Sequence, residues 1–404
     1  MSIIETINFG YPAGTAGAER DGYFHRISEA QEIALSTVQR WVVDNEINMS
    51  ILSSFALHPV LTLLRYLRAN SFDPEKTIEH IKRSCKWRKS MGMDELIVAD
   101  PELVLGFPMS DFMSNFPHFH AGYDLSGRPV MYKQYSLIDA TTLMRKTDLE
   151  QLLKYHVWEQ EVCMRLCKEQ SLKTGYIVET TTTILDLKDM RLAQVNKDFL
   201  AFVKAIAAVD SKYYPETLGK MFVINAPSAF PFVWRMVKLW LDADVASKIQ
   251  VMSGPREWLP VLSECIGLEN IPSNYGGKAK PLDVSAHPYE EAMSLIKSSE
   301  NSRQPTTLTG VGLGSTSSEA GVASSTFRMP SVSNGVEPTM LRRTLSMSRD
   351  EEEVGSYQSL SDHHFCDAKE AASQNSSSNP HALHSMPQIP ETTLQSVEWD
   401  EGLA

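Results

Sequence analysis

Strand-like and helical segments alternate along the middle of this chain, and this alternation restricts the possible folds more than any other feature. The strand-like segments are rich in β-branched and apolar residues, and the helices between them are long enough to cross a sheet. The predicted strands are 130–135, 180–187, 220–225 and 249–252, and the predicted helices begin at Asp148 or cover 192–209 and 232–241. Strands joined by such crossovers form a mostly parallel sheet with helices on its faces. We therefore expect an α/β fold.

A group of helices is predicted before this alternation begins. Ser28 and Gln31 form a capping box, and apolar residues follow at helical spacing. Further along, Asp73 and Pro74 suit the N-cap and first position of another helix. The sequence thus predicts a small helical domain at 25–98, followed by an α/β domain at 99–297.

Composition changes sharply near residue 297. From Ser298 onward the chain is rich in Ser, Thr, Gly, Asn, Pro and acidic residues, and its apolar residues show no period. We expect a disordered tail at 298–404 and a flexible segment at 1–24. The tail holds most of the formal charge of −12, and so acidic a chain is not expected to bind nucleic acid.

Cysteine use and hydropathy predict a cytoplasmic protein. Five cysteines spread over 404 residues do not suggest a disulfide framework, so a reducing compartment is expected. The uncharged runs 47–64 and 221–234 contain several polar residues or prolines, and neither resembles a membrane span of roughly 20 apolar residues. The first residues carry neither a basic start nor an apolar core, which predicts no signal peptide.

Motifs of enzymatic chemistry are missing from the sequence. No phosphate-binding loop or nucleophile elbow occurs, and no cysteine has an arginine six residues later. Cys163 and Cys167 lie four residues apart on a predicted helix, where packing in the core is the simpler interpretation than metal binding. We expect a protein that is not an enzyme and uses no metal and no cofactor.

A series of short phrases resembles the CRAL-TRIO lipid-binding family, in particular its yeast-type phosphatidylinositol transfer proteins. They occur in the family's order and at its spacing, and together they cover roughly residues 25–280. The phrases are 63–69 (LLRYLRA) with 87–88 (WR), 127–130 (GRPV), 178–180 (VET), 184–188 (ILDLK), 213–216 (YYPE), 224–227 (INAP), 247–249 (SKI) and 275–277 (YGG). The resemblance implies a helical domain packed on an α/β domain whose sheet forms the floor of an apolar pocket, with a bound phospholipid as ligand.

The resemblance also implies a movable helix that closes the pocket. It corresponds to 229–241, which is apolar on nearly every face; its gate residues are Phe230, Phe232, Trp234, Met236, Val237 and Trp240. Such a helix would contact a membrane surface transiently, with its tryptophans at the interface. The alternative interpretation is a fully buried core helix.

The headgroup residues implied by the resemblance are Glu216 and Lys248. The carboxylate would accept hydrogen bonds from inositol hydroxyls, the ammonium would pair with the phosphate, and Ser247 would add a neutral hydrogen bond. The alternative is that Glu216 and Lys248 are ordinary solvated surface residues.

Thr181 and Thr183 lie two apart on a predicted strand and so face the same side. In family members with two ligands, hydroxyl residues at these positions contact the phosphate of phosphatidylcholine; the alternative is simple strand propensity. Three positions depart from the family: His120 and Met131 replace tyrosines that contact choline, and Asn70 replaces a basic residue that helps to hold phosphate. These departures leave open whether phosphatidylcholine, or any second lipid, is bound.

The tail contains two adjacent arginines three residues before Ser346, with an acidic run after it. This arrangement suits a basophilic protein kinase, although serine-rich tails also produce such strings by accident. Phosphorylation at Ser346 would weaken attraction to an anionic membrane.

Together these features predict a cytoplasmic, peripherally membrane-associated carrier. It would bind phosphatidylinositol and transfer it between membranes or present it to enzymes such as a lipid kinase. Two alternatives remain: a carrier of a sterol, squalene, tocopherol or retinoid, and a lipid-sensing adaptor whose tail recruits partners.

Overall fold

The computed structural model describes residues 9–12, 21–49, 52–55, 57–283, 288–290 and 292–294, all within one compact unit that spans 1–306. The predicted tail at 298–404, including Ser346, lies outside the described residues, as does most of the predicted flexible segment at 1–24. The domain boundary predicted between residues 98 and 99 stays a prediction, because the predicted helical domain and the predicted α/β domain fall within the same compact unit.

Three helices form the N-terminal layer: α2 (Glu29–Asp44), α3 (Pro59–Ala69) and α4 (Pro74–Ser90). The capping box predicted at Ser28 is present, and the Asp73 side chain accepts hydrogen bonds from the first turn of α4. Apolar faces of the three helices meet in a common core. Its members include Leu35, Val38, Leu64, Leu67 and Ile81, all almost fully buried. Local caps therefore determine where these helices start, and burial holds them together.

Three short helices connect this layer to the sheet: α5 (Met93–Leu96), α6 (Pro101–Leu105) and α7 (Met109–Asn115). After the first two strands, the 3-10 turn η3 (Tyr135–Leu137) and the short helix α8 (Ala140–Lys146) lead into a long helix. The long helix α9 (Leu149–Thr174) is capped by Asp148 and ends at Gly175, whose φ of 73° suits a glycine. It is buried along most of its length.

The sheet has five strands in the order β1-β2-β3-β4-β5. They are β1 (His118–Tyr123), β2 (Pro129–Gln134), β3 (Thr181–Asp186), β4 (Leu218–Ile224) and β5 (Ile249–Val251). Only β1 pairs antiparallel with its neighbour, and the other three pairings are parallel. The α/β fold with a mostly parallel sheet is therefore confirmed.

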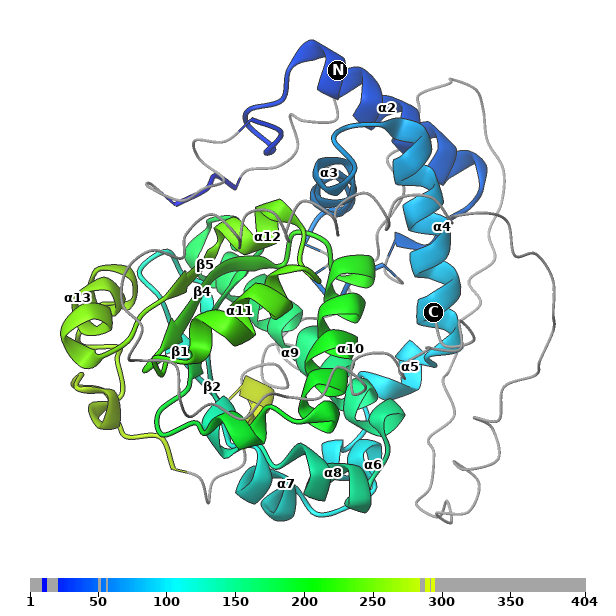
Figure 1. Ribbon diagram of the computed structural model, residues 1–404. Helices are drawn as coiled ribbons and strands as arrows, with labels where there is room; N and C mark the ends of the chain where they lie inside the picture. Colours follow the sequence, from blue (N-terminus) through cyan, green and yellow to red (C-terminus); the bar gives the residue numbers. More distant parts are fainter. Residues whose placement is uncertain are drawn as a thin grey trace, which may run out of the picture. The chain divides into compact units, whose positions relative to one another are not determined.

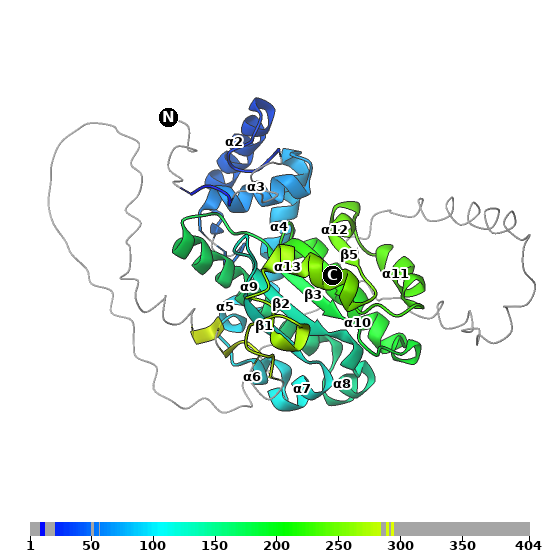
Figure 2. The ribbon, with the colours of Figure 1, turned by 90° about the vertical axis from the view of Figure 1, so that its left-hand side faces the viewer.

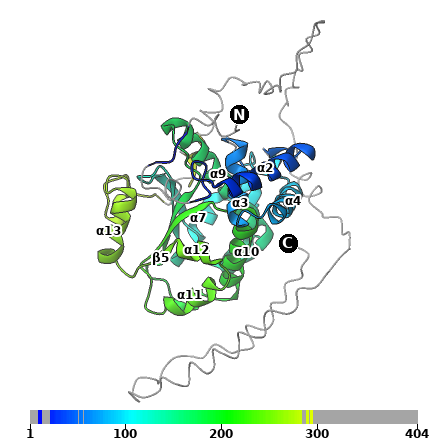
Figure 3. The ribbon, with the colours of Figure 1, turned by 90° about the horizontal axis from the view of Figure 1, so that it is seen from above.

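Helices cover both faces of the sheet, as Figure 1 and Figure 3 show. The helix α13 (Pro255–Ile266) lies on one face, and α9, α10 (Lys197–Tyr213) and α11 (Phe230–Lys238) lie on the other. Figure 2 shows the sheet between these layers. The remaining elements are the 3-10 turns η4 (Leu192–Gln194) and η5 (Ser273–Tyr275) and the short helix α12 (Ala243–Ser247), which leads directly into β5.

The structure adds one strand that was not predicted and corrects the bounds of two predicted helices. β1 was not predicted, because its sequence HFHAGY contains no β-branched residue. The helix expected at 192–209 begins only at Lys197, where Asn196 caps it through the amide of Phe199, and it continues to Tyr213. The helix expected at 232–241 occupies 230–238 instead.

Buried polar contacts attach the helical layer to the α/β layer. The Arg88 guanidinium lies 2.6 Å from the Glu161 carboxylate, and both side chains are almost fully buried. The Trp87 ring stacks on Tyr213 with a centroid distance of 3.9 Å. A buried ion pair and a stacked aromatic pair fix the orientation of α4 against α9 and α10.

Candidate functional site

A cavity of about 1080 Å³ lies between the sheet and the helices α9, α10 and α11. This volume is at the upper end of the roughly 300–1,000 Å³ typical of sites for drug-sized ligands. Its walls are mostly apolar. They include Met131, Leu185, Met221 and Val223 from the strands, Phe199, Val203 and Ile206 from α10, and Val233, Trp234 and Val237 from α11. The site can therefore hold a large ligand with an extended apolar part.

Strand periodicity explains why the floor of the cavity is continuous. Met131, Thr183 and Met221 are register partners on three adjacent strands, so their side chains leave the same face of the sheet. The residues next to them, such as Tyr132 and Phe222, point to the opposite face and are fully buried there. The Tyr132 ring lies 4.9 Å from Tyr275, on the side of α13.

The α11 helix forms one wall of the cavity with a single face. Phe230, Val233, Trp234 and Val237 line the cavity at helical spacing, as a helix with one apolar stripe would place them. On the other side Phe232 is 50% exposed, and Arg235 and Lys238 are exposed too. The alternative interpretation, a fully buried core helix, is therefore wrong, and the exposed side combines the apolar Phe232 with two cations.

Of the other predicted gate residues, Met236 and Trp240 are half-buried and do not line the cavity among the described residues. Leu239, which follows the helix directly, is 83% exposed. The segment therefore offers an apolar face to the cavity and separate apolar side chains, flanked by two cations, to solvent. Whether α11 moves stays a prediction.

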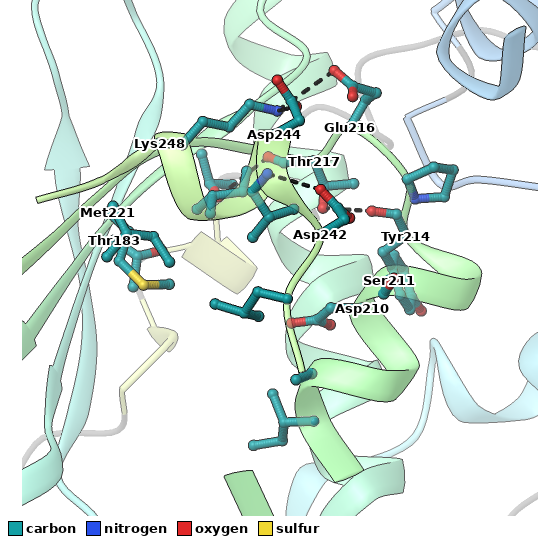
Figure 4. Close-up of a pocket in the computed structure, with 18 of the residues that line it drawn as sticks. Thr183, Asp210, Ser211, Tyr214, Glu216, Thr217, Met221, Asp242, Asp244 and Lys248 are labelled. Carbon is teal, nitrogen blue, oxygen red and sulfur yellow. Dashed lines mark hydrogen bonds and ion pairs between the residues drawn. The ribbon is translucent and has the colours of Figure 1, made fainter. Parts of the chain in front are cut away.

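Three charged side chains form an outer cluster at one end of the cavity: Glu216, Asp244 and Lys248. The Lys248 ammonium lies 2.7 Å from Asp244 Oδ2 and 3.6 Å from Glu216 Oε2. Figure 4 shows the Lys248 ammonium directed at both carboxylates. The structure thus brings the predicted pair Glu216 and Lys248 together at the cavity, with side chains largely buried.

Local backbone geometry positions both predicted residues. Glu216 lies in the short link between α10 and β4 and has a φ of 57°, a left-handed conformation that costs a non-glycine residue on the order of 1 kcal/mol or more. Lys248 caps the end of α12, and its carbonyl accepts the Met221 amide at the start of the β4–β5 pairing. The left-handed backbone of Glu216 and the position of Lys248 at the end of α12 therefore direct the two charged side chains towards each other.

Two further charged residues, Asp244 and Arg68, contact Lys248 or Glu216, and neither was among the predicted headgroup residues. Asp244 lies four residues before Lys248 on α12, a spacing at which opposite charges on a helix meet, so this signal was visible. Arg68 also lines the cavity, with Nε 3.9 Å from Glu216 Oε2 and Nη2 3.1 Å from Glu179 Oε1. Burial lowers the pKa of Arg68, but the Glu179 and Glu216 carboxylates and the hydroxyls of Tyr23 and Tyr11 together raise it more, and the net shift is upward. The nearby Arg65 donates to the Glu179 carbonyl and braces the two layers.

The other predicted headgroup residues divide into two groups. Thr181 and Thr183 both line the cavity, on the same face of β3 as predicted. Ser247 does not line it among the described residues: its hydroxyl donates to the Asp244 carbonyl at 2.6 Å, and it borders a separate cavity of about 300 Å³. The two threonines can therefore reach a ligand in the main cavity, whereas Ser247 faces elsewhere.

The three positions that depart from the family also differ in placement. Met131 lines the cavity, and Asn70 lies at its edge, where it donates to the Tyr66 carbonyl and contacts His80. His120 is not among the described lining residues, and burial lowers its pKa to about 4, so the ring is neutral. Of the two positions where the resemblance implies tyrosines that contact choline, Met131 offers no aromatic ring and His120 is not among the described lining residues, so neither supplies a cation–π contact.

A second set of charges, which sequence reasoning missed, lines the cavity away from the outer cluster. This inner cluster consists of Lys133, His156, Glu159 and Asp210. Lys133 Nζ lies 2.8 Å from Glu159 Oε2, and His156 Nε2 lies 2.7 Å from Asp210 Oδ1. No sequence signal could have found it, because the residues come from β2, α9 and α10 and meet only through packing.

Neither a metal-binding group nor a reactive thiol is found among the described residues of the site. Within the described ranges, no group of three His, Cys, Asp or Glu side chains is arranged to hold a metal ion. Cys163 and Cys167 are buried, and burial raises the pKa of both thiols, which makes them unreactive. In the same part of the chain, no helix combines the length and the apolar character that crossing a bilayer requires.

A parallel sheet that floors a large apolar cavity with a few charges at its ends defines a class of proteins that enclose hydrophobic ligands. The family model described as "CRAL/TRIO domain" matches residues 114–277. Curated relatives titled as Sec14 cytosolic factors are 33% identical over 224 residues in Kluyveromyces lactis and 31% identical over 221 residues in Schizosaccharomyces pombe. These matches cover 54% of this chain in both cases and 71% and 74% of the relatives. The chain belongs to the CRAL-TRIO family, which confirms the resemblance.

Two further matches agree with this assignment. An Arabidopsis thaliana relative titled "Phosphatidylinositol/phosphatidylcholine transfer protein SFH12" is 33% identical over 225 residues, which are 55% of this chain and 40% of that protein. The solved structure titled "Crystal structure of Sfh5" superposes with a TM-score of 0.50 at 15% identity, covering 68% of this chain and 98% of that one. At this identity the structural likeness shows the fold alone.

Proposed function

We propose that this protein encloses one phospholipid, phosphatidylinositol, in the main cavity and transfers it between membranes or presents it to lipid-modifying enzymes. It acts as a cytoplasmic carrier without catalysing a reaction itself. The observation that carries the proposal is the outer cluster, where Glu216 and Lys248 meet at one end of an otherwise apolar cavity. The titles of the relatives, which name such transfer proteins, support the same ligand class.

The apolar cavity supplies most of the driving force for taking up a lipid. Two acyl chains of about 16 carbons hold on the order of 30 methylenes, each worth about 0.8 kcal/mol on burial, so moving a free phospholipid through water costs more than about 20 kcal/mol. The walls from the sheet, α10 and α11 replace water around those chains. A protein with this cavity lowers the barrier for exchange between membranes.

The outer cluster supplies headgroup selection. Lys248 pairs with the lipid phosphate, and the Glu216 and Asp244 carboxylates accept hydrogen bonds from inositol hydroxyls. Thr181 and Thr183 add hydroxyl groups on the floor of the same cavity. A headgroup that carries both a phosphate and several hydroxyls satisfies this mixture of one cation and two anions better than a phosphate alone.

The exposed side of α11 suits contact with a membrane surface. Phe232 and Leu239 present apolar side chains, and Arg235 and Lys238 are attracted to anionic lipids. The inner side of the same helix closes the cavity. A carrier that docks through this side brings its wall helix to the place where the lipid must enter.

Mass spectrometry of bound lipid tests the proposal. The full chain is incubated with mixed vesicles that contain phosphatidylinositol, phosphatidylcholine, sterol, squalene, tocopherol and retinol, re-isolated and extracted. We expect phosphatidylinositol in the wild type and its loss in Lys248→Met and Glu216→Gln. Lys278→Met is the matched control, because that lysine forms an exposed ion pair with Glu269 outside the lining of the cavity. Melting curves establish that each variant is folded.

Other results would contradict the proposal. Recovery of only a neutral isoprenoid would indicate a different cargo, and equal phosphatidylinositol loading in Lys248→Met would remove the outer cluster from headgroup binding. A transfer assay between vesicles separates a carrier from an adaptor. A chain cut after residue 297 should keep transfer if the protein is a carrier, and loss of transfer with lipid still bound would favour the adaptor.

A further inference from the structure

The inner cluster is a second polar site in the same cavity, and the phosphatidylinositol proposal does not use it. Lys133 and Glu159 are linked at 2.8 Å, and His156 joins Asp210 at 2.7 Å and Glu159 at 3.6 Å. The Tyr289 hydroxyl also donates to Glu159. These side chains form one continuous network that borders the cavity.

The strand register separates the inner cluster from the outer one. Lys133 pairs in register with Leu185, which pairs with Val223, whereas Lys248 precedes Ile249, the partner of Met221. Three strand spacings of about 4.8 Å and three residues of about 3.3 Å put the Cα atoms of the two lysines about 17 Å apart. Their side chains also have different carboxylate partners. The two clusters therefore mark different regions of the cavity.

The network keeps hydrogen-bonding capacity for a ligand. Among the described residues, the Lys133 ammonium donates only to Glu159, so further N–H groups are available to the cavity. Asp210 Oδ1 accepts from His156 and Gln160, while Asp210 Oδ2 accepts no hydrogen bond from the part of the chain that the structure describes. The site thus offers both a donor and an acceptor.

Within the inner cluster, two cations face two carboxylates. Lys133 and protonated His156 contact Glu159 and Asp210, and the His118 ring also lies 3.5 Å from Glu159 Oε1, where its Nε2 contacts the Tyr155 hydroxyl. Burial lowers the pKa of His156, but the charge and hydrogen bond of Asp210 and the hydrogen bond of Glu159 together raise it more, to about 9, so the ring is positive at neutral pH. A headgroup with a net charge would upset this balance in a site of low dielectric constant, and a neutral headgroup would not.

We propose that the inner cluster binds the free hydroxyl group of a second, neutral lipid, the class to which diacylglycerols and sterols belong. A hydroxyl accepts a hydrogen bond from Lys133 and donates one to a carboxylate oxygen of the cluster, on Glu159 or Asp210, while Met131 and Leu185 surround the apolar body. A quaternary ammonium does neither and is repelled by Lys133. A carboxylate would accept from Lys133 but would meet two anions, the buried Glu159 and the partly exposed Asp210.

A pair of ligands that differ only in the hydroxyl group tests this proposal. The full chain is loaded from vesicles that contain tritiated dioleoylglycerol or its acetylated derivative, in which the hydroxyl is capped, and is then re-isolated. Labelled phosphatidylcholine and oleate are measured in the same way. We expect about 10- to 100-fold more of the free-hydroxyl lipid than of the capped one, because a buried group left without its partner weakens binding to this extent.

Variants of the inner cluster complete the design. Lys133→Met should bring retention of dioleoylglycerol down to that of the capped lipid, while Lys278→Met leaves the ratio unchanged. Because Lys133→Met removes the nearest cation from Glu159, the double variant Lys133→Met/Glu159→Gln repeats the test with the net charge of the cluster restored. The same samples are assayed for phosphatidylinositol, whose loading should depend on Lys248 and not on Lys133.

Several results would overturn the inference. Equal retention of the free and capped lipids, stronger retention of phosphatidylcholine or oleate, or an unchanged ratio in both Lys133 variants would each do so. If phosphatidylinositol still loads in those experiments, the proposed function stands while the second site falls. If no lipid of any kind is retained, both proposals fail together.

Discussion

The pH dependence of stability gives a quantitative test of the contacts inside the cavity. His156 on α9 is largely buried, with Nε2 2.7 Å from Asp210 Oδ1 and Nδ1 3.6 Å from Glu159 Oε2. Burial alone would lower the pKa of the imidazole, but the charge and hydrogen bond of Asp210 and the hydrogen bond of Glu159 together raise it more, to about 9. The ordinary value in an unfolded chain is about 6.5. Folding therefore favours the protonated ring.

The size and direction of the effect follow from this difference. A shift of about 2.5 pKa units corresponds to about 3 kcal/mol, at about 1.36 kcal/mol per unit. The Asp210 side chain is 34% exposed, so solvent screening reduces the expected value to about 2 kcal/mol. Because the folded-state pKa is the higher one, this stabilisation is fully present below about pH 6.5 and is lost as the pH rises through about 9.

Urea denaturation of the wild type and of His156→Gln measures the effect. The free energy of unfolding is determined for both proteins near pH 6 and near pH 9.5, and the difference between them is compared. Other groups titrate in both proteins, so their contributions cancel in the difference. We expect the wild-type advantage to shrink by about 2 kcal/mol at the higher pH. An advantage that stays constant or grows would refute the assignment of a charged His156.

Other predictions concern the layer interface, a tight loop and the exposed side of α11. Arg88→Met should lower the free energy of unfolding by about 3 kcal/mol or more, measured in urea, because Glu161 would remain buried without its cation; a loss below about 1 kcal/mol would contradict this. Gly277→Ala should lower the melting temperature by several degrees, because its Cβ would lie 2.0 Å from a backbone oxygen, whereas Gly254→Ala, with nothing within 4 Å, should not. Phe232→Glu should weaken sedimentation with anionic vesicles while leaving the melting temperature unchanged, and equal sedimentation would argue against membrane contact through this side.

Local signals were sufficient to predict much of the fold. The caps at Ser28, Asp73 and Asp148 are all present, because each depends only on a side chain and amides two or three residues later. Four of the five strands were predicted within two residues, since buried parallel strands have short apolar or β-branched runs. β1 escaped because pairing with β2, and not its own composition, makes it a strand.

The candidate site likewise contains some residues that the sequence indicated and others that only the fold brings together. Glu216 and Lys248 were found through resemblance, and Asp244 was detectable from its spacing of four residues before Lys248. The inner cluster has no such signal: Lys133 and Glu159 are 26 residues apart and meet because α9 packs against β2. The two faces of α11 were readable, since Arg235 and Lys238 lie three apart on one side of a helix. Contacts within an element are local information, and contacts between elements require the fold.

The pairing of charges before any ligand arrives bears on how a carrier releases its cargo. In the proposed function, the lipid phosphate competes with Asp244, which holds the Lys248 ammonium at 2.7 Å. Uptake thus exchanges one ion pair for another. The net gain in binding free energy is much smaller than that of a new buried pair, because Lys248 is already paired before the lipid binds. Affinity then comes mainly from the acyl chains, which a membrane solvates equally well, while the outer cluster decides between headgroups. A site organised in this way favours selection over tight retention, and selection with ready release is what repeated transfer requires.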